Sequence, residues 1–177
     1  VFDRVVNDLE VPTTSFKATD LILIANPVKT PDGMHSMRRV MALTEVRKHW
    51  QKDPLEERGF VDLLKYNVEK DELEPTQELI NGESEIIKSI AGNVKGWAGN
   101  WDAVYDNIIL RGQVKQEIVD AALKLGKPEL MEAPFNSLSN LAFHRISEII
   151  MQEKGLPWSE FVFPVWKQWL YEAAGKY

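Results

Sequence analysis

The three histidines are the first side chains to consider for catalysis or metal binding, since imidazole serves both chemistries. His35 falls in a turn-rich stretch, His49 follows an apolar run, and His144 lies in a helical pattern. No His-x-x-x-His or Glu-x-x-His pair occurs, and the chain contains no cysteine. Because zinc and similar ions need several ligands at compatible spacing, we expect no metal site. A Ser–His–Asp triad has its residue types, but no G-x-S-x-G nucleophile turn accompanies them.

Acidic pairs and phosphate-binding loops are the next chemistry to consider. The pairs Glu56-Glu57 and Asp71-Glu72 lie in turn-like stretches. An acid/base pair needs a cleft that separates the two pKa values, so we assign these solvated carboxylates no catalytic role. The G-x-x-x-x-G-K-[ST] motif is absent from the sequence. We therefore expect neither ATP binding nor ATP hydrolysis by this chain alone.

Four basic residues form a candidate interface. Arg38 and Arg39 open an apolar, β-branched run, and Arg47 and Lys48 close it. One interpretation is an edge strand that its charges protect from aggregation. The other is a subunit interface, where arginines pair with a neighbour's carboxylates or reach its nucleotide.

The six tryptophans are the most conspicuous feature of the composition. Trp166 and Trp169 are three residues apart in the last segment, close to Trp158 and Tyr171. Tryptophan at helical spacing is usually part of a core, because each ring buries a large apolar area. Exposed tryptophan is also enriched at binding hot spots. These four residues are therefore a candidate partner interface.

The elements that position these residues are of two kinds. An N-terminal helix is indicated over Phe2–Pro12 by apolar residues at i, i+3, i+4 and i+7. Leu21–Ala25 is predicted to be a strand buried on both faces, and Pro27, Pro31 and Asp32-Gly33 mark the connection to a second strand. The remaining β pattern comprises strands at Arg38–Val46 and Gly59–Tyr66, an exposed loop between them at His49–Glu57, and a turn with a short fourth strand over Asn67–Glu74.

Beyond Gly82 the periodicity becomes helical. One helix is predicted to end near Gly92, and a long one to run from an N-cap at Asn100 to Gly126. Leu138–Gln152 is a further amphipathic helix, and the last segment aligns apolar residues on one face. The predicted class is α+β, with an antiparallel β part over residues 1–80 and a helical part over 81–177. The predicted inward faces are Leu138, Ala142, Ile146, Ile149 and Ile150 in the former helix, and Val162, Trp166, Trp169 and Ala173 in the latter.

The net charge of −6 excludes some partners. Val1–Tyr66 holds ten basic and ten acidic residues, so the negative charge falls on Asn67–Tyr177. That excess would repel a phosphate backbone, and we expect no nucleic-acid binding. It could instead attract a basic protein surface. The longest apolar run is far below the about 20 residues that a membrane span needs, so we expect no membrane insertion.

Several stretches together resemble a known family. DLILIANPV (Asp20–Val28) followed by RRVMALTEV (Arg38–Val46) resembles the hairpin that follows the catalytic core in the type II/IV secretion ATPases, especially the archaeal branch. These proteins are hexameric motors of protein secretion, pilus assembly and the archaellum. FDRVVNDLEVP (Phe2–Pro12) is similar to the helix before that hairpin. The resemblance covers most of the chain and continues through SEIIKSIA (Ser84–Ala91), Arg111 in a long helix, and a last amphipathic helix.

The resemblance implies a role in a larger machine. The family's acidic and histidine boxes, which precede this region, are absent, and the chain starts at Val1. We therefore expect the C-terminal portion of a cytoplasmic motor that assembles as a homo-oligomeric ring and meets the membrane through a platform protein. ATP and Mg²⁺ would be cofactors of the full-length protein and not of this portion. The alternatives are a stand-alone adaptor module without a motor domain and a small hydrolase without a recognisable motif.

Overall fold

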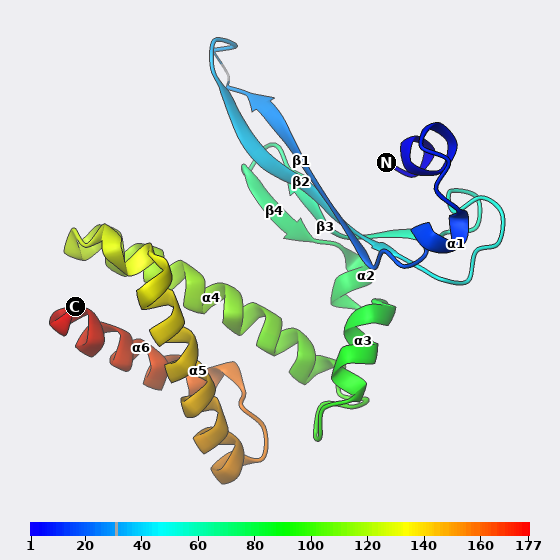
Figure 1. The fold of residues 1–177 in the computed structure, drawn as a ribbon. Helices are drawn as coiled ribbons and strands as arrows, with labels where there is room; N and C mark the ends of the chain where they lie inside the picture. The colour runs from blue at the N-terminus through cyan, green and yellow to red at the C-terminus, as the bar shows by residue number, and fades with distance from the viewer. Residues whose placement is uncertain (31) are drawn as a thin grey trace. The chain divides into compact units, whose positions relative to one another are not determined.

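The computed structural model describes residues 1–30 and 32–177, and Pro31 lies outside the described residues. Its contacts divide the chain into two compact units, Val1–Ile90 and Ala91–Tyr177. The first unit holds an antiparallel sheet with short helices and the second is helical (Figure 1), so the α+β class is confirmed. The expected boundary after residue 80 differs from the observed one, because α2 (Gln77–Ile80) contacts β3 and α3 (Glu85–Gly92) begins against the sheet.

The sheet of the first unit is a meander in the order β1-β2-β3-β4, as the turn signals predicted. Each strand pairs antiparallel with the next along the chain. β2 is central, so the interpretation of Arg38–Val46 as an edge strand is wrong. The strands are β1 (Leu21–Lys29), β2 (Ser36–Val46), β3 (Phe60–Asn67) and β4 (Glu72–Pro75).

β1 is an edge strand and is not buried on both faces, which corrects the prediction for Leu21–Ala25. Exposure alternates along it: Leu21 and Leu23 are 42% and 61% exposed, whereas Ile22 and Ile24 are half-buried. Only β2 pairs with it in the described sheet. The edge position also explains why Pro27, which has no backbone N–H, is tolerated inside a strand.

An aromatic core joins the N-terminal helix to the sheet. Phe2 makes edge-on contacts with three rings, at centroid distances of 5.0 Å to Phe16, 5.6 Å to Trp50 and 6.2 Å to Phe60. The helix forms as the π-helix η1 (Arg4–Asp8) and ends before Pro12, because Glu10 adopts a positive φ of 54°. The buried centre of this cluster is Phe16 of α1 (Thr13–Phe16), Val46 and Trp50.

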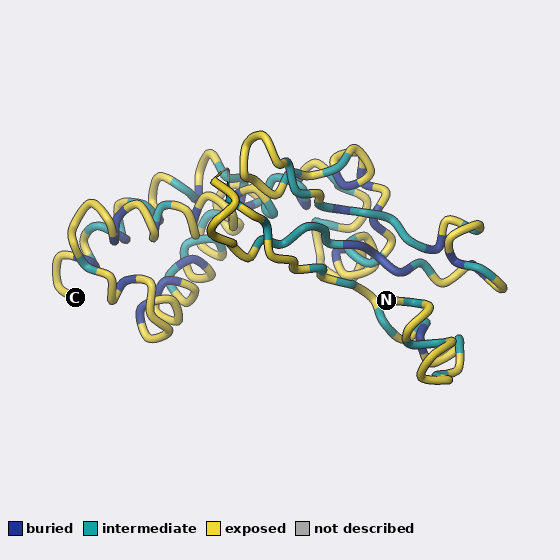
Figure 2. Tube along the Cα trace, turned by 90° about the horizontal axis from the view of Figure 1, so that it is seen from above, coloured by how far each residue is buried: buried dark blue, intermediate teal, exposed yellow. Residues whose placement is uncertain are grey.

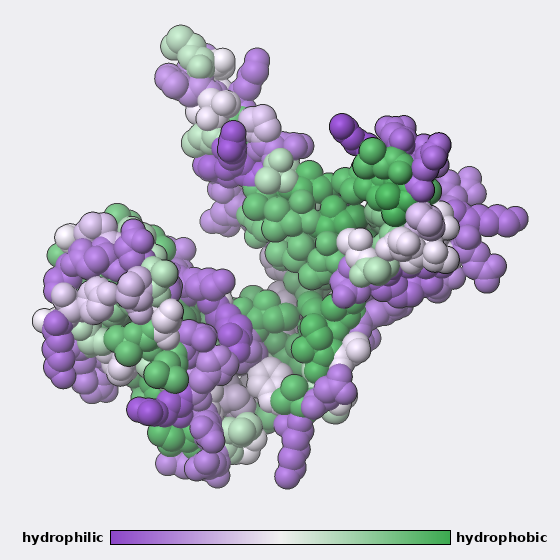
Figure 3. Space-filling view, in the orientation of Figure 1, coloured by the Kyte–Doolittle hydropathy of each residue, from purple (hydrophilic) through white to green (hydrophobic). Residues whose placement is uncertain are grey.

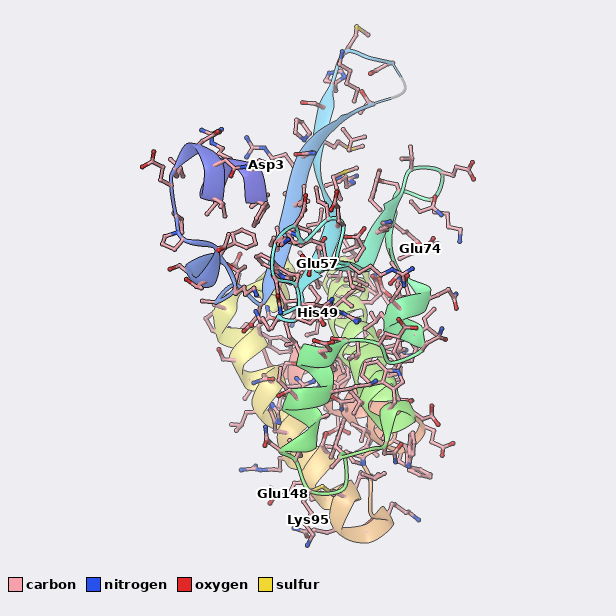
Figure 4. The ribbon with its side chains drawn as sticks, turned by 90° about the vertical axis from the view of Figure 1, so that its right-hand side faces the viewer. Asp3, His49, Glu57, Glu74, Lys95 and Glu148 are labelled. Carbon is pink, nitrogen blue, oxygen red and sulfur yellow. The ribbon has the colours of Figure 1, made fainter. Side chains whose placement is uncertain are left out.

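The loop between β2 and β3 is more than the exposed connection that its charges predicted. Trp50 is fully buried within it. Gly59 permits that burial, because a Cβ there would lie 2.5 Å from Trp50 Cδ1 and 2.7 Å from Pro54 Cβ. The Glu57 carboxylate accepts hydrogen bonds from three backbone amides of the loop, and the Glu57 carbonyl lies 2.7 Å from His49 Nε2 (Figure 4).

The second unit consists of helices α4 (Trp101–Leu125), α5 (Ala133–Lys154) and α6 (Ser159–Lys176), with a 3₁₀ turn η2 (Pro128–Met131). The local signals at the ends of α4 are confirmed. Asn100 Oδ1 accepts from the Ala103 amide at 3.2 Å, and Gly126 takes the left-handed conformation with φ 64°.

α6 packs against both α4 and α5, and buried residues recur along these helices (Figure 2). On α6 the buried positions are Val162, Trp166, Leu170 and Ala174, four residues apart, so the predicted face with Trp169 and Ala173 is rotated from the observed one. On α5, Leu138 and Ile149 are 43% and 49% exposed, contrary to prediction. The fully buried positions of α5 are Phe135, Ser139 and Phe143.

No helix in the described part of the chain is both long enough and apolar enough to cross a membrane.

Candidate protein-binding surfaces

The four basic residues of the predicted cluster are separated by the register of the sheet. Arg38 and Arg39 lie opposite Pro27 and Asn26, in the part of the β1–β2 hairpin that has no β3 partner. Arg47 follows the last residue of β2, at the other end of the strand. They therefore form two sites and not one.

Arg39 is held by an ion pair inside the unit. Its Nε and a terminal nitrogen donate to the two oxygens of Asp71 at 2.6 and 2.7 Å, and Tyr66 Oη also donates to Asp71 at 2.6 Å. The Arg39 hydrogen bonds, followed by the one from Tyr66, hold the pKa of Asp71 well below its ordinary value. The same contacts raise the pKa values of Arg39 and Tyr66. This two-pronged pair ties the hairpin to the β3–β4 turn.

Arg38 is exposed, and its guanidinium has no hydrogen-bond or ion-pair partner among the described residues. It lies on the part of the hairpin that continues past β3, which we call the hairpin arm (Asn26–Arg39, Pro31 excepted; Figure 1). Met34 and Met37 on this arm are 81% and 39% exposed. The arm thus carries a free cation and two exposed methionines.

Arg47 belongs to a buried junction between the sheet and α3. Glu45 is fully buried, and its carboxylate accepts from the Ser84 hydroxyl and from the Glu85 amide, the latter at 2.9 Å. Arg47 donates to the Glu83 carbonyl at 2.7 Å, and its Nε lies 3.9 Å from Glu45 Oε1. This arrangement caps the start of α3, a structural role that explains the basic residue without a partner protein.

Lys48 also has partners within the unit. Its Nζ donates to the carbonyls of Lys17 and Thr19 at 2.7 and 2.6 Å, and lies 3.0 Å from Asp20 Oδ1. It therefore closes the segment between α1 and β1. Of the four predicted interface residues, Arg38 is the one left available in the described structure.

The predicted aromatic surface is divided by burial. Trp166 is fully buried in the helical core, so its ring is not accessible to a partner. Tyr171 Oη donates to Glu117 Oε1 at 3.0 Å, and Lys167 Nζ donates to Glu117 Oε2 at 2.7 Å. The Glu117 hydrogen bond raises the pKa of Tyr171 and also that of Lys167. This triad joins α4 to α6.

Trp158 and Trp169 remain half-buried, and Trp169 lines a groove of about 290 Å³ between α5 and α6. Its ring stacks on Phe135 at a centroid distance of 6.2 Å. Leu138, 43% exposed, and Tyr177, 47% exposed, also line the groove. We call it the α5–α6 groove. Sequence reasoning missed Leu138 and Tyr177 as surface residues, since their burial depends on which face of α5 meets α6.

The histidines take part in local contacts. His35 Nδ1 lies 3.1 Å from Asp32 Oδ2 in the hairpin tip, where Thr30 and the Met34 amide also donate to Asp32. These hydrogen bonds lower the pKa of Asp32 to about 2. His144 packs edge-on against Phe143. Within the described residues, no group of three or more His, Cys, Asp or Glu side chains could hold a metal ion.

The structure relocates the negative charge. Val1–Ile90 holds twelve basic and seventeen acidic residues, whereas Ala91–Tyr177 holds nine and ten. The excess lies in the segment from the β3–β4 turn to α3, which belongs with the sheet. The helical unit is nearly neutral, so an electrostatic attraction to a basic partner falls to the sheet unit.

No family model matches the chain, and no curated protein matches it.

Proposed function

We propose that this chain is a non-catalytic, protein-binding portion of a ring-forming motor ATPase of protein secretion or pilus assembly. The sequence resemblance supplies the class of machine, and the hairpin arm supplies the observation that supports a binding role. Its Arg38 is exposed without a side-chain partner among the described residues, and Met34 and Met37 are exposed as well. Arginine and methionine are both enriched at protein interfaces.

The surface around the arm also favours this proposal. Hydrophobic side chains gather over the base of the β1–β2 hairpin and over α2 and α3 (Figure 3). The exposed hydrophobic side chains of this unit include Leu21, Leu23 and Ile90, the last 64% exposed. A surface region where hydrophobic side chains gather is typical of an interaction site. In a ring, we expect this face to meet the rest of the motor or a neighbouring subunit.

The test compares two charge removals on the same arm, made in the complete product of the natural reading frame. Arg38→Ala should lower the fraction assembled as rings, measured by light scattering after size exclusion. Lys29→Ala is the matched control, because Lys29 is also exposed and has no ion-pair partner among the described residues. Unchanged assembly in Arg38→Ala, or an equal loss in Lys29→Ala, would remove the support that the arm gives to this function.

The α5–α6 groove favours a second candidate function, a stand-alone adaptor. Its half-buried Trp169 and exposed Tyr177 resemble the aromatic anchors of binding sites. If the reading frame upstream of Val1 encodes no phosphate-binding loop, this adaptor role replaces the motor role. In that case Trp169→Ala should abolish partner capture, whereas the exposed Leu123→Ala on α4 should leave it unchanged.

A further inference from the structure

We propose that the helical unit binds a phosphate monoester in the cavity between α4 and α5. This cavity of about 240 Å³ is separate from the hairpin arm and from the α5–α6 groove, and we call it the α4–α5 cavity. α4 contributes Arg111 and Lys115 to its lining, and α5 contributes Ser139 and Asn140. The inference stands independently of the proposed motor function, since it concerns residues that the function does not use.

Arg111 is fixed with its anion-binding end free. Its guanidinium carbon lies 4.9 Å from the centroid of the Phe143 ring, and its Nε donates to Asn107 Oδ1 at 3.0 Å. These two contacts hold the guanidinium plane at the cavity wall. Its two terminal nitrogens have no hydrogen-bond partner among the described residues. A planar guanidinium with two unpaired terminal nitrogens can donate to two oxygens of a phosphoryl group at once.

Lys115 adds a second positive charge one helical turn further along α4. Neither Lys115 nor Arg111 lies within ion-pair distance of a carboxylate in the described part of the chain, whereas Lys167, on the neighbouring α6, pairs with Glu117. Two cations without a counter-charge facing one cavity favour a dianion over a monoanion. A phosphate monoester is a dianion above its second pKa of about 6.

Ser139 contributes a hydroxyl at the wall of the cavity that a bound molecule can reach. The residue is 2% exposed, yet its hydroxyl makes no hydrogen bond to the described residues. Because the hydroxyl is open to the cavity, it can donate a hydrogen bond to a ligand oxygen there. Asn140, the next residue of α5, is exposed and lines the cavity with a second polar side chain.

The rest of the lining indicates the kind of molecule that carries the phosphoryl group. Val114, Ile118 and Phe143 form an apolar floor beside the two cations. The volume lies slightly below the about 300 Å³ at which typical ligand pockets begin. The cavity therefore fits a phosphoryl group attached to a small apolar or aromatic group, and phenyl phosphate is a suitable probe.

The experiment titrates the ¹⁵N-labelled chain with phenyl phosphate at pH 7.5 and follows the backbone amide signals. We expect saturable shifts confined to α4 and α5. Arg111→Ala should weaken the affinity by about tenfold or more, the loss expected for a charge-assisted hydrogen bond. Ser139→Ala, which leaves the packing volume nearly unchanged, should weaken it by a smaller factor. Lowering the pH below about 6 should weaken it as well, because the ligand becomes a monoanion.

One control variant and two control ligands accompany the titration. Arg145→Ala removes an exposed cation from α5 that does not line the cavity, and it should leave the affinity within about twofold. Benzoate tests the dianion requirement, and vesicles containing phosphatidic acid distinguish a lipid headgroup from a free phosphate monoester. Vesicle binding that Arg111→Ala removes supports the same phosphoryl chemistry from a lipid source. Absence of saturation, equal binding of benzoate, or an equal loss in Arg145→Ala overturns the proposal.

Discussion

Trp166 and Trp158 have opposite structural roles despite lying eight residues apart. Trp166 is fully buried in the core of the helical unit, whereas Trp158 is half-buried at the start of α6. We predict that Trp166→Ala lowers the free energy of unfolding by about 3–5 kcal/mol, the usual cost of truncating a buried aromatic ring. Trp158→Ala should cost well under half of that. Urea denaturation followed by circular dichroism measures both, and similar costs would contradict the assigned burial.

The carboxylate of Asp32 makes the order of the hairpin tip dependent on pH. Its folded pKa of about 2 lies below the ordinary value of 3.8, because Thr30, the Met34 amide and His35 hydrogen-bond to it. The stabilisation is therefore fully present above about pH 4 and is lost progressively as the pH falls through 2. The protection factor of the Met34 amide, its exchange rate relative to that of an unstructured amide at the same pH, should fall in that window. Asp32→Asn should remove the pH dependence, and an unchanged profile in that variant would contradict the assignment.

Sequence reasoning at the level of single residues succeeded where the signal is local. The cap at Asn100 and the stop at Gly126 depend on residues within one turn, and both are confirmed. The partner of Arg39 could not be found in this way, because Asp71 lies 32 residues further along the chain. The same applies to Glu45, whose partner Ser84 is 39 residues away.

The junction between β2 and α3 is the element-scale feature with the clearest energetic consequence. Glu45→Gln should lower the free energy of unfolding by about 1.5–3 kcal/mol, since it weakens charge-assisted hydrogen bonds to Ser84 and Glu85. Glu83→Gln is the matched control, because that exposed side chain has no hydrogen-bond partner among the described residues, and its effect should stay within about 0.5 kcal/mol. Chemical denaturation of both variants tests this prediction, and equal midpoints would contradict it.

Element types were predictable, but the faces that the elements bury were less so. The strand and turn signals predicted the meander, since Gly, Pro and Asp punctuate it regularly. Periodicity also predicted α5 and α6. It misassigned their inward faces, because α5 carries apolar residues such as Leu141 and Ile149 on its exposed side as well. Which side is buried depends on the packing partner, and one helix's sequence does not contain that information.

At the scale of the whole molecule, the charge distribution changes the expected mode of partner binding. We expected the acidic excess to lie in the helical half, but it belongs to the sheet unit. If a basic platform surface binds this unit, the association rate should fall as the salt concentration rises. Added salt screens the attraction between charges, and the Debye length is already about 8 Å at physiological ionic strength. Stopped-flow measurements on the full-length protein test this, and a salt-independent rate would contradict it.

The central claim is that this chain is a non-catalytic part of a larger motor. The most direct test measures Mg²⁺-dependent ATP hydrolysis by residues 1–177 and by the complete product of the natural reading frame, side by side. We predict no turnover by the isolated chain, because its sequence has no phosphate-binding loop, and turnover with ring assembly by the complete product. Turnover by the isolated chain that a point change within it abolishes would contradict the claim. A complete product that lacks a nucleotide-binding loop and does not hydrolyse ATP would contradict it equally.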